Sequence, residues 1–173
     1  MENVPAIVGA GIAAEIAGRE LPKRSAYVAR LQKRLWEGLQ AKVPHLKLNG
    51  PPIGPKRICA NLNISAEFVE GEGLLLMLDA RGIAVASGTS CVSKSLKVSH
   101  VLGAIGLDQG LGQAAIMLTL GQDNTDADID YVLETLPQVV SKLRDMSPVW
   151  DEFQRGAVDS VITPRQKPAA KTK

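Results

Sequence analysis

The chain has 173 residues, the size of one ordinary domain, and 45% of them are hydrophobic, which is enough to form a core. Aromatic residues make up only 3%, so aliphatic side chains must fill that core. With 20 basic and 18 acidic residues the formal net charge is +2, which gives no reason to expect a nucleic-acid or membrane partner. No apolar run approaches the length of a membrane span.

The first part of the chain is predicted to be helical. Residues 3–17 are apolar and rich in alanine, with Asn3 as the N-cap, and we expect Gly18 to end this helix. A second helix is predicted over residues 21–43 and ends at Pro44. Its apolar residues recur at helical spacing, at Val28, Leu31, Leu35 and Leu39.

Short strands and helices are predicted to alternate after residue 44. Apolar patterns predict strands over 45–48, 58–65, 83–86 and 114–120. Further helices are predicted over 70–80, where Gly82 ends the helix, and over 99–105. A last helix is predicted from Thr125, where Asp128 completes a capping box, and Pro137 is expected to kink it. The fold class expected is α/β, in which a few-stranded sheet is packed with helices.

The end of the chain has a different composition. Residues 164–173 read PRQKPAAKTK, with four positive charges, two prolines and no large apolar residue. Such a segment cannot bury enough surface to offset the entropy of ordering it, so we expect a solvated tail. The division expected is a domain over 1–158 and a basic disordered tail over 159–173.

Two cysteines are present, Cys59 and Cys91, without a CxxC pair, so no disulfide framework is expected. The start of the chain does not resemble a signal peptide. These observations favour a reducing, cytoplasmic setting in which a thiol stays free. Cys59 lies in a predicted strand, where we expect a small buried hydrophobic residue.

Residues 85–102, VASGTSCVSKSLKVSHVL, contain the most informative cysteine. A predicted strand leads into a loop rich in serine and glycine, with Cys91 in its middle and Lys94 and Lys97 after it. Nearby cations favour the thiolate, which is the reactive form of cysteine, and loops on a rigid scaffold often carry chemistry. The residues alone also allow Cys91 to be an ordinary small loop residue. The chain has no phosphate-binding glycine motif and too few histidines for most zinc sites.

The same segment resembles the cysteine desulfurase signature, in which a strand runs into SSGSAC-T-S-G-S-L-E-P-SHVL. The residues that match in register are Ser87, Gly88, Cys91, Ser93, Ser95, Leu96, Ser99, His100, Val101 and Leu102. Other motifs similar to the family occur in order at residues 3–9 (NVPAIVG), 48–50 (LNG), 61–63 (NLN), 69–72 (VEGE), 82–85 (GIAV), 129–132 (IDYV) and 147–150 (SPVW). The resemblance extends from Asn3 to about Val158.

This resemblance implies the C-terminal, small domain of a pyridoxal-phosphate enzyme of the aspartate-aminotransferase-like fold, known as fold type I. Members of the family convert L-cysteine to L-alanine and hold the sulfur as a persulfide for iron–sulfur cluster assembly. Cys91 would then be the nucleophile and persulfide carrier, within a loop formed by Ser87, Gly88, Thr89, Ser90 and Ser93. The implied partners are a sulfur-acceptor protein and a second copy of the chain in a homodimer.

Two departures from the family pattern bear on function. The family's large domain holds the Schiff-base lysine and most phosphate contacts, and no lysine of this chain matches that lysine. We therefore expect a separate PLP-binding N-terminal domain or companion chain, and an excised domain, a split-gene subunit and a remnant all remain open. Met117 replaces the family arginine that grips the substrate carboxylate, a role that a thioether cannot fill.

Met117 therefore leaves a second hypothesis, a non-catalytic dimerisation or sulfur-relay module that has lost substrate recognition. A third hypothesis keeps the enzyme and changes its substrate. The two histidines are not expected to take part in the chemistry. His100 is expected to have a structural role at a helix start, and His45 is assigned no role.

Overall fold

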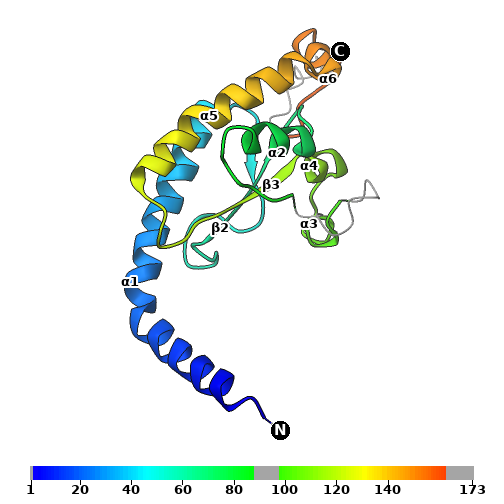
Figure 1. Cartoon of the computed structure of the whole chain (residues 1–173). Helices are drawn as coiled ribbons and strands as arrows, with labels where there is room; N and C mark the ends of the chain where they lie inside the picture. Colours follow the sequence, from blue (N-terminus) through cyan, green and yellow to red (C-terminus); the bar gives the residue numbers. More distant parts are fainter. Residues whose placement is uncertain (1, 88–97, 163–173) are drawn as a thin grey trace, which may run out of the picture.

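The computed structural model describes residues 2–87 and 98–162, and it contains a small antiparallel sheet and several helices (Figure 1). The helices are α1 (Val4–Lys42), α2 (Gly71–Asp79), α3 (His100–Ala104), α4 (Gln109–Gln113), α5 (Asp126–Asp145) and α6 (Pro148–Gln154). The strands are β1 (Leu46–Leu48), β2 (Asn61–Ala66) and β3 (Ala115–Thr119). Among the described residues, no helix is both long and apolar enough to cross a bilayer.

The sheet has the order β1-β2-β3, and both pairs of neighbouring strands are antiparallel. Leu62 lies opposite Leu118 and Ile64 opposite Ile116, so one face of the sheet is apolar and fully buried. Because side chains alternate along a strand, Asn61 and Asn63 lie on the other face. The two faces of this sheet therefore differ sharply in polarity.

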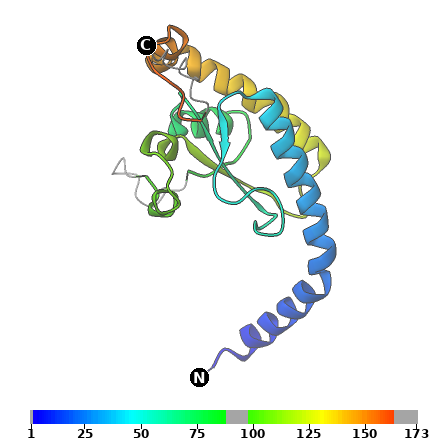
Figure 2. The same cartoon turned by 180° about the vertical axis from the view of Figure 1, so that it is seen from behind.

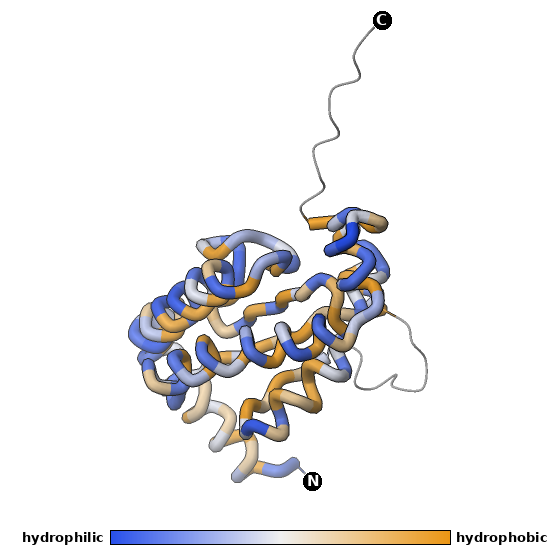
Figure 3. The backbone as a smooth tube through the Cα atoms, turned by 90° about the horizontal axis from the view of Figure 1, so that it is seen from above, coloured by the Kyte–Doolittle hydropathy of each residue, from blue (hydrophilic) through white to orange (hydrophobic). Residues whose placement is uncertain are grey.

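The apolar face of the sheet belongs to the main core, together with the second half of α1 and with α5. These two helices lie side by side along the sheet (Figures 1 and 2). Leu31, Leu35 and Leu39 are fully buried, as the helical spacing predicts. Hydrophobic and hydrophilic residues alternate along the helices, which is the pattern of amphipathic helices at a surface (Figure 3).

The prediction of two separate helices before residue 44 is wrong, because α1 is one helix of 39 residues. Gly18 costs a helix interior only about 1 kcal/mol, and the helix-forming residues around it compensate. Pro22 lies inside α1 and lacks the amide that would bond to the preceding turn. The helix bends between its two halves, and its first half extends away from the rest of the described chain (Figures 1 and 2).

The start of α5 is confirmed. Thr125 accepts a hydrogen bond from the amide of Asp128, and the Asp128 side chain accepts one from the amide of Thr125, which completes the predicted capping box. Pro137 lies within this helix, which is assigned as continuous from Asp126 to Asp145.

Two strand predictions need correction. Residues 83–86 form only an isolated bridge, from Ala86 to Met117, because the amide of Ile83 is still bonded to Leu78 O at the end of α2. Gly82 ends that helix with φ 74°, as predicted. β2 begins at Asn61 rather than residue 58, and Ile58 is 76% exposed.

The last described residues, 159–162, form a segment that we call the C-terminal strap. Glu67 accepts hydrogen bonds from Ser160 Oγ and from the amide of Val161, both at 2.5 Å. Ser160 is only 2% exposed, so the strap is held against the domain. The division between a domain and a basic tail at residue 159 stays a prediction, but the residues just after that boundary pack on the domain.

A polar and aromatic cluster surrounds the point where the strap is bound. Arg144 Nε donates to Glu67 O at 3.1 Å and Nη2 donates to Pro44 O at 2.8 Å, while its guanidinium lies 4.9 Å from the Trp150 ring centre. Burial lowers the pKa of Arg144 to about 10. His45 Nδ1 lies 3.2 Å from Ser160 Oγ, and its ring contacts Phe68, Trp150 and Phe153. His45, for which the sequence predicts no role, is thus a structural residue.

The close approach of α2 to the end of α4 predicts that Gly71 tolerates no side chain. A Cβ at Gly71 would lie 2.5 Å from Gln113 O, and a backbone atom cannot move aside. We expect Gly71→Ala to lower the free energy of unfolding by about 1–3 kcal/mol in urea denaturation. Gly9→Ala, where a Cβ meets nothing within 4 Å, is the control and is expected not to lower it. Equal stability of Gly71→Ala and the parent would contradict this packing.

The environment of His45 predicts a loss of stability at mildly acidic pH. Burial of the ring, and then the charge of Arg144, lower the pKa of His45 below its ordinary 6.5, while Glu67 acts in the opposite direction. The folded chain therefore binds fewer protons than the unfolded chain, so this contribution to stability is complete above pH 6.5 and declines as the pH falls below it. His45→Asn should lose less stability between pH 7.5 and 5.5, measured by urea denaturation. Asparagine also tolerates the positive φ of 55° at this position. Identical pH profiles for variant and parent would contradict this assignment.

Candidate functional site

The chain approaches the Cys91 segment along the edge strand of the sheet. The amide of Ala86 donates to Met117 O at 3.1 Å, and the amide of Met117 donates to Ala86 O at 2.7 Å. This pair of bonds fixes the backbone one residue before Ser87, which is half-buried. Of the predicted site residues, only Ser87 and Met117 are described, whereas Cys91, Gly88, Thr89, Ser90 and Ser93 lie outside the described residues.

The chain leaves the same segment at Val98, which packs on a second, small core. That core consists of Leu102, Leu107, Leu111 and Ala115, and Ile162 of the C-terminal strap also packs on it. Gly112 lies beneath Val98, and a Cβ there would come within 2.3 Å of Val98 Cγ1. Residues 88–97 are therefore bounded by two fixed points, Ala86 against β3 and Val98 against α3 and α4.

Met117 faces the polar side of the sheet. It lies directly opposite Asn63, and its Sδ accepts a hydrogen bond from Asn61 Nδ2 at 3.2 Å. Asn63 Oδ1 accepts from Asn49 Nδ2 at 2.7 Å, and Asn49 also donates to Ser65 Oγ at 2.8 Å. These neutral side chains can orient a polar ligand, but a thioether and amides do not provide the bidentate cation that a carboxylate binds best.

The sequence does not predict these asparagines, Asn49, Asn61 and Asn63, which we call the asparagine row, as part of a site. In the sequence, Asn61 and Asn63 stand out only as part of a family-like motif, although their alternation with buried Leu62 and Ile64 places them together on one face. That they share this face with Met117 depends on the register between β2 and β3, which the order of residues in the chain does not show.

The described cavities do not fit pyridoxal phosphate. The cofactor needs a lysine for its aldehyde and cations or free amides for its phosphate. The larger cavity, of about 590 Å³, is lined by acidic and apolar residues and by no lysine or arginine among the described residues. A smaller one, of about 330 Å³, contains Lys42 and Arg144, but both donate to backbone carbonyl groups. Across residues 2–87 and 98–162 there is also no group of side chains suited to a metal ion.

The other two residues considered in the sequence, Cys59 and His100, lie in places that fit a structural role. Cys59 precedes β2 instead of lying within it, and it is half-buried against the main core. His100 is the first residue of α3 and is exposed, in agreement with a helix-start position.

Relatives with known names support the resemblance. A family model described as aminotransferase class-V matches residues 1–132. The cysteine desulfurase IscS of Clostridium botulinum (strain Hall) is 43% identical over 154 residues, which are 89% of this chain and 39% of that protein. The cysteine desulfurase IscS of Methanosarcina thermophila is 45% identical over 148 residues, 86% of this chain and 36% of that protein. The chain thus spans less than two fifths of the length of these relatives.

Solved structures agree with the predicted fold class. A NifS-like protein that is 30% identical superposes with a TM-score of 0.66, over 83% of this chain and 35% of that chain. The NifS-like protein from Rickettsia africae, at 24% identity and a TM-score of 0.69 over 82% of this chain and 36% of that chain, supports the fold alone. The fold prediction, a small domain of the fold-type I transferases, is confirmed. The chain belongs to the class-V aminotransferase family.

Proposed function

We propose that this chain is the sulfur-carrying part of a PLP-dependent cysteine desulfurase, with Cys91 as the residue that receives sulfur from L-cysteine. The observation that carries the proposal is the 43% identity to proteins named cysteine desulfurase over most of this chain. The described residues on either side of the Cys91 segment support it: Ala86 is bonded to Met117 on β3, and Val98 packs on the small core. L-Alanine would be the other product.

The proposed step at Cys91 is a nucleophilic attack. The Cys91 thiolate attacks the sulfur of the substrate, an S–S bond forms, and the C–S bond of the substrate breaks with its electron pair left on carbon. Lys94 and Lys97 follow Cys91 closely in the sequence and would favour the thiolate. The persulfide is then available to a sulfur-acceptor protein for iron–sulfur cluster assembly, in a cytoplasmic setting.

We propose that a separate domain supplies the cofactor, since the cavities among the described residues do not fit it. The first half of α1 supports the need for such a partner. Val4, Ile7, Val8 and Ile12 are each more than half exposed, and helical spacing places them on one side of the helix. We propose that a PLP-binding N-terminal domain or companion chain covers this side, and that the complete enzyme is a homodimer.

A non-catalytic sulfur-relay or dimerisation module is the second candidate, and Met117 is the observation that favours it. The names of the relatives favour the enzyme instead. The two candidates differ in whether L-cysteine is turned over when the cofactor domain is present, which the following variants measure.

The proposed sulfur carrier predicts a specific loss on substitution. With a PLP-binding domain of a matching desulfurase supplied, Cys91→Ser should reduce sulfide release about a hundredfold or more, because the nucleophile is removed. Mass spectrometry of the parent should find one added sulfur atom on the peptide that contains Cys91. Cys59→Ser is the matched control and should retain activity. Unchanged sulfide release in Cys91→Ser would rule out this assignment.

The asparagine-lined position of Met117 predicts a gain when a guanidinium is introduced. In the same assay, Met117→Arg should raise kcat/KM for L-cysteine about 10- to 100-fold, because a bidentate pair with the substrate carboxylate becomes possible. Met117→Lys is the control, and its gain should be smaller because an ammonium group binds as a point charge. Turnover that is equally low in the parent and in both variants would favour the non-catalytic module.

A further inference from the structure

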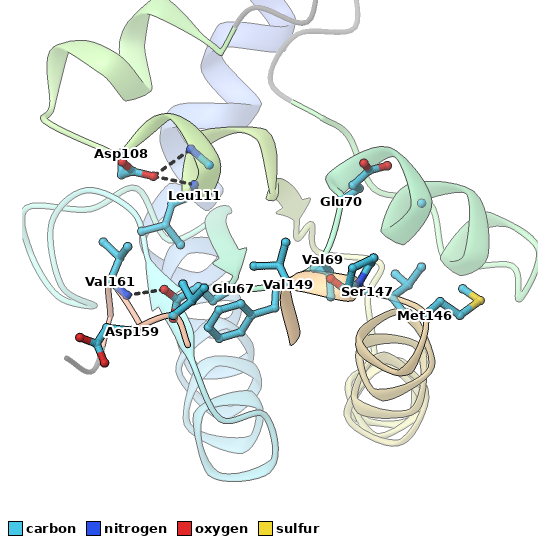
Figure 4. A pocket seen from close by; sticks show the side chains of 16 residues that line it. Glu67, Val69, Glu70, Asp108, Leu111, Met146, Ser147, Val149, Asp159 and Val161 are labelled. Carbon is cyan, nitrogen blue, oxygen red and sulfur yellow. Dashed lines mark hydrogen bonds between the residues drawn. The ribbon is translucent and has the colours of Figure 1, made fainter. Parts of the chain in front are cut away.

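The larger cavity is not lined by Met117 or by the asparagines beside it, and the proposed sulfur chemistry assigns it no role. It has a volume of about 590 Å³ and is bordered by the start of α2, by α4, by the end of α5 and by the C-terminal strap. Figure 4 shows Val69, Leu111, Met146 and Val149 among the apolar side chains of its wall. An apolar cavity of this size, open to solvent, can hold several residues of an extended peptide.

All the charged side chains that line this cavity, among the described residues, are acidic. Glu70, Asp108 and Asp159 lie around it on three different elements, with Glu67 deeper inside (Figure 4). Among the described residues that line it there is no lysine, arginine or histidine. Glu67 is bound to the strap, and Asp108 Oδ1 accepts from the amide of Gly110 at 2.8 Å. Glu70 is exposed and makes no capping bond to α2. The cavity therefore fits a ligand that combines positive charge with apolar surface.

The chain itself continues into such a segment. Val161 lines the cavity, and Ile162 packs on the small core beside α4, so the described chain ends at the edge of the cavity. The next residues are Thr163-Pro164-Arg165-Gln166-Lys167-Pro168. Six residues span up to about 20 Å, which is enough to cross the cavity.

We propose that residues 164–168 bind in this cavity as an intramolecular ligand. Arg165 and Lys167 would pair with Glu70 and Asp108, and the prolines and the aliphatic stems of the two cations would lie on the apolar wall. A tether of one or two residues keeps this segment at a high effective concentration, so weak contacts suffice. The sequence predicts a solvated tail because the segment has too little apolar surface to form a core of its own. Binding in this cavity does not require a core of its own, because the rest of the domain already forms the cavity. Because the contacts are ionic and exposed, binding weakens with salt.

Limited trypsin digestion of the full chain tests this proposal. The Arg165–Gln166 bond should be protected, while the Lys171–Thr172 bond beyond the cavity serves as an internal reference. In Glu70→Gln/Asp108→Asn, cleavage at Arg165 relative to Lys171 should rise about tenfold, and 0.5 M NaCl should have a similar effect on the parent. Asn at position 108 retains the capping group of α4. Asp123→Asn/Glu134→Gln is the matched control, with the same charge change at exposed sites, and should behave as the parent.

A second measurement leaves the domain unaltered. In full-chain NMR spectra, Arg165→Gln/Lys167→Gln should shift the amide signals of Gly110 and Val69, whereas Arg19→Gln/Lys23→Gln should not. Equal cleavage ratios in the parent and the cavity variant, or unshifted signals at Gly110 and Val69, would overturn the proposal. A cleavage ratio that depends on protein concentration would also overturn it, because the ligand would then be the tail of a second copy.

Discussion

The apolar face of the sheet is the constraint on which the rest of this structure depends. Three short strands cannot form a core alone, so their apolar side chains Leu62, Ile64, Ile116 and Leu118 must be covered by helices, here α1, α2 and α5. Once these helices lie on that face, the opposite face is left to asparagine and methionine side chains. Ala86, the last paired residue before the Cys91 segment, is bonded to Met117, whose side chain lies on that second face. The partial exposure of Met117 and its asparagine neighbours of β2 on the second face therefore follows from which face the helices cover.

Local signals predicted the helices best. The Thr125 capping box and the αL glycine at Gly82 are determined by a few neighbouring residues, so they could be predicted from the sequence. The spacing of Leu31, Leu35 and Leu39 likewise identified the buried side of α1. Gly18 was misleading because a glycine interrupts a helix only when the flanking residues do not sustain it.

Features that depend on distant contacts could not be predicted. His45 has no informative neighbours in the sequence, and its place in the core of the aromatic cluster depends on Phe68, Trp150 and Phe153. Met117 was identified through a family resemblance, but its contact with Asn61 depends on strand register. The cavity beside the strap combines side chains from four separate parts of the chain, and no single motif indicates it.

The continuity of α1 has a mechanical consequence. This single helix, about 58 Å long, is packed in the domain along one half and projects from it along the other. Any domain or chain that binds the projecting half of α1 is connected to the sheet domain through a continuous helix instead of a flexible linker. The orientation of that domain or chain relative to the sheet is then set by the bend in α1, where Pro22 removes one backbone hydrogen bond and makes the helix easier to bend. A small change in that angle would be amplified into a large displacement at the far end of the helix.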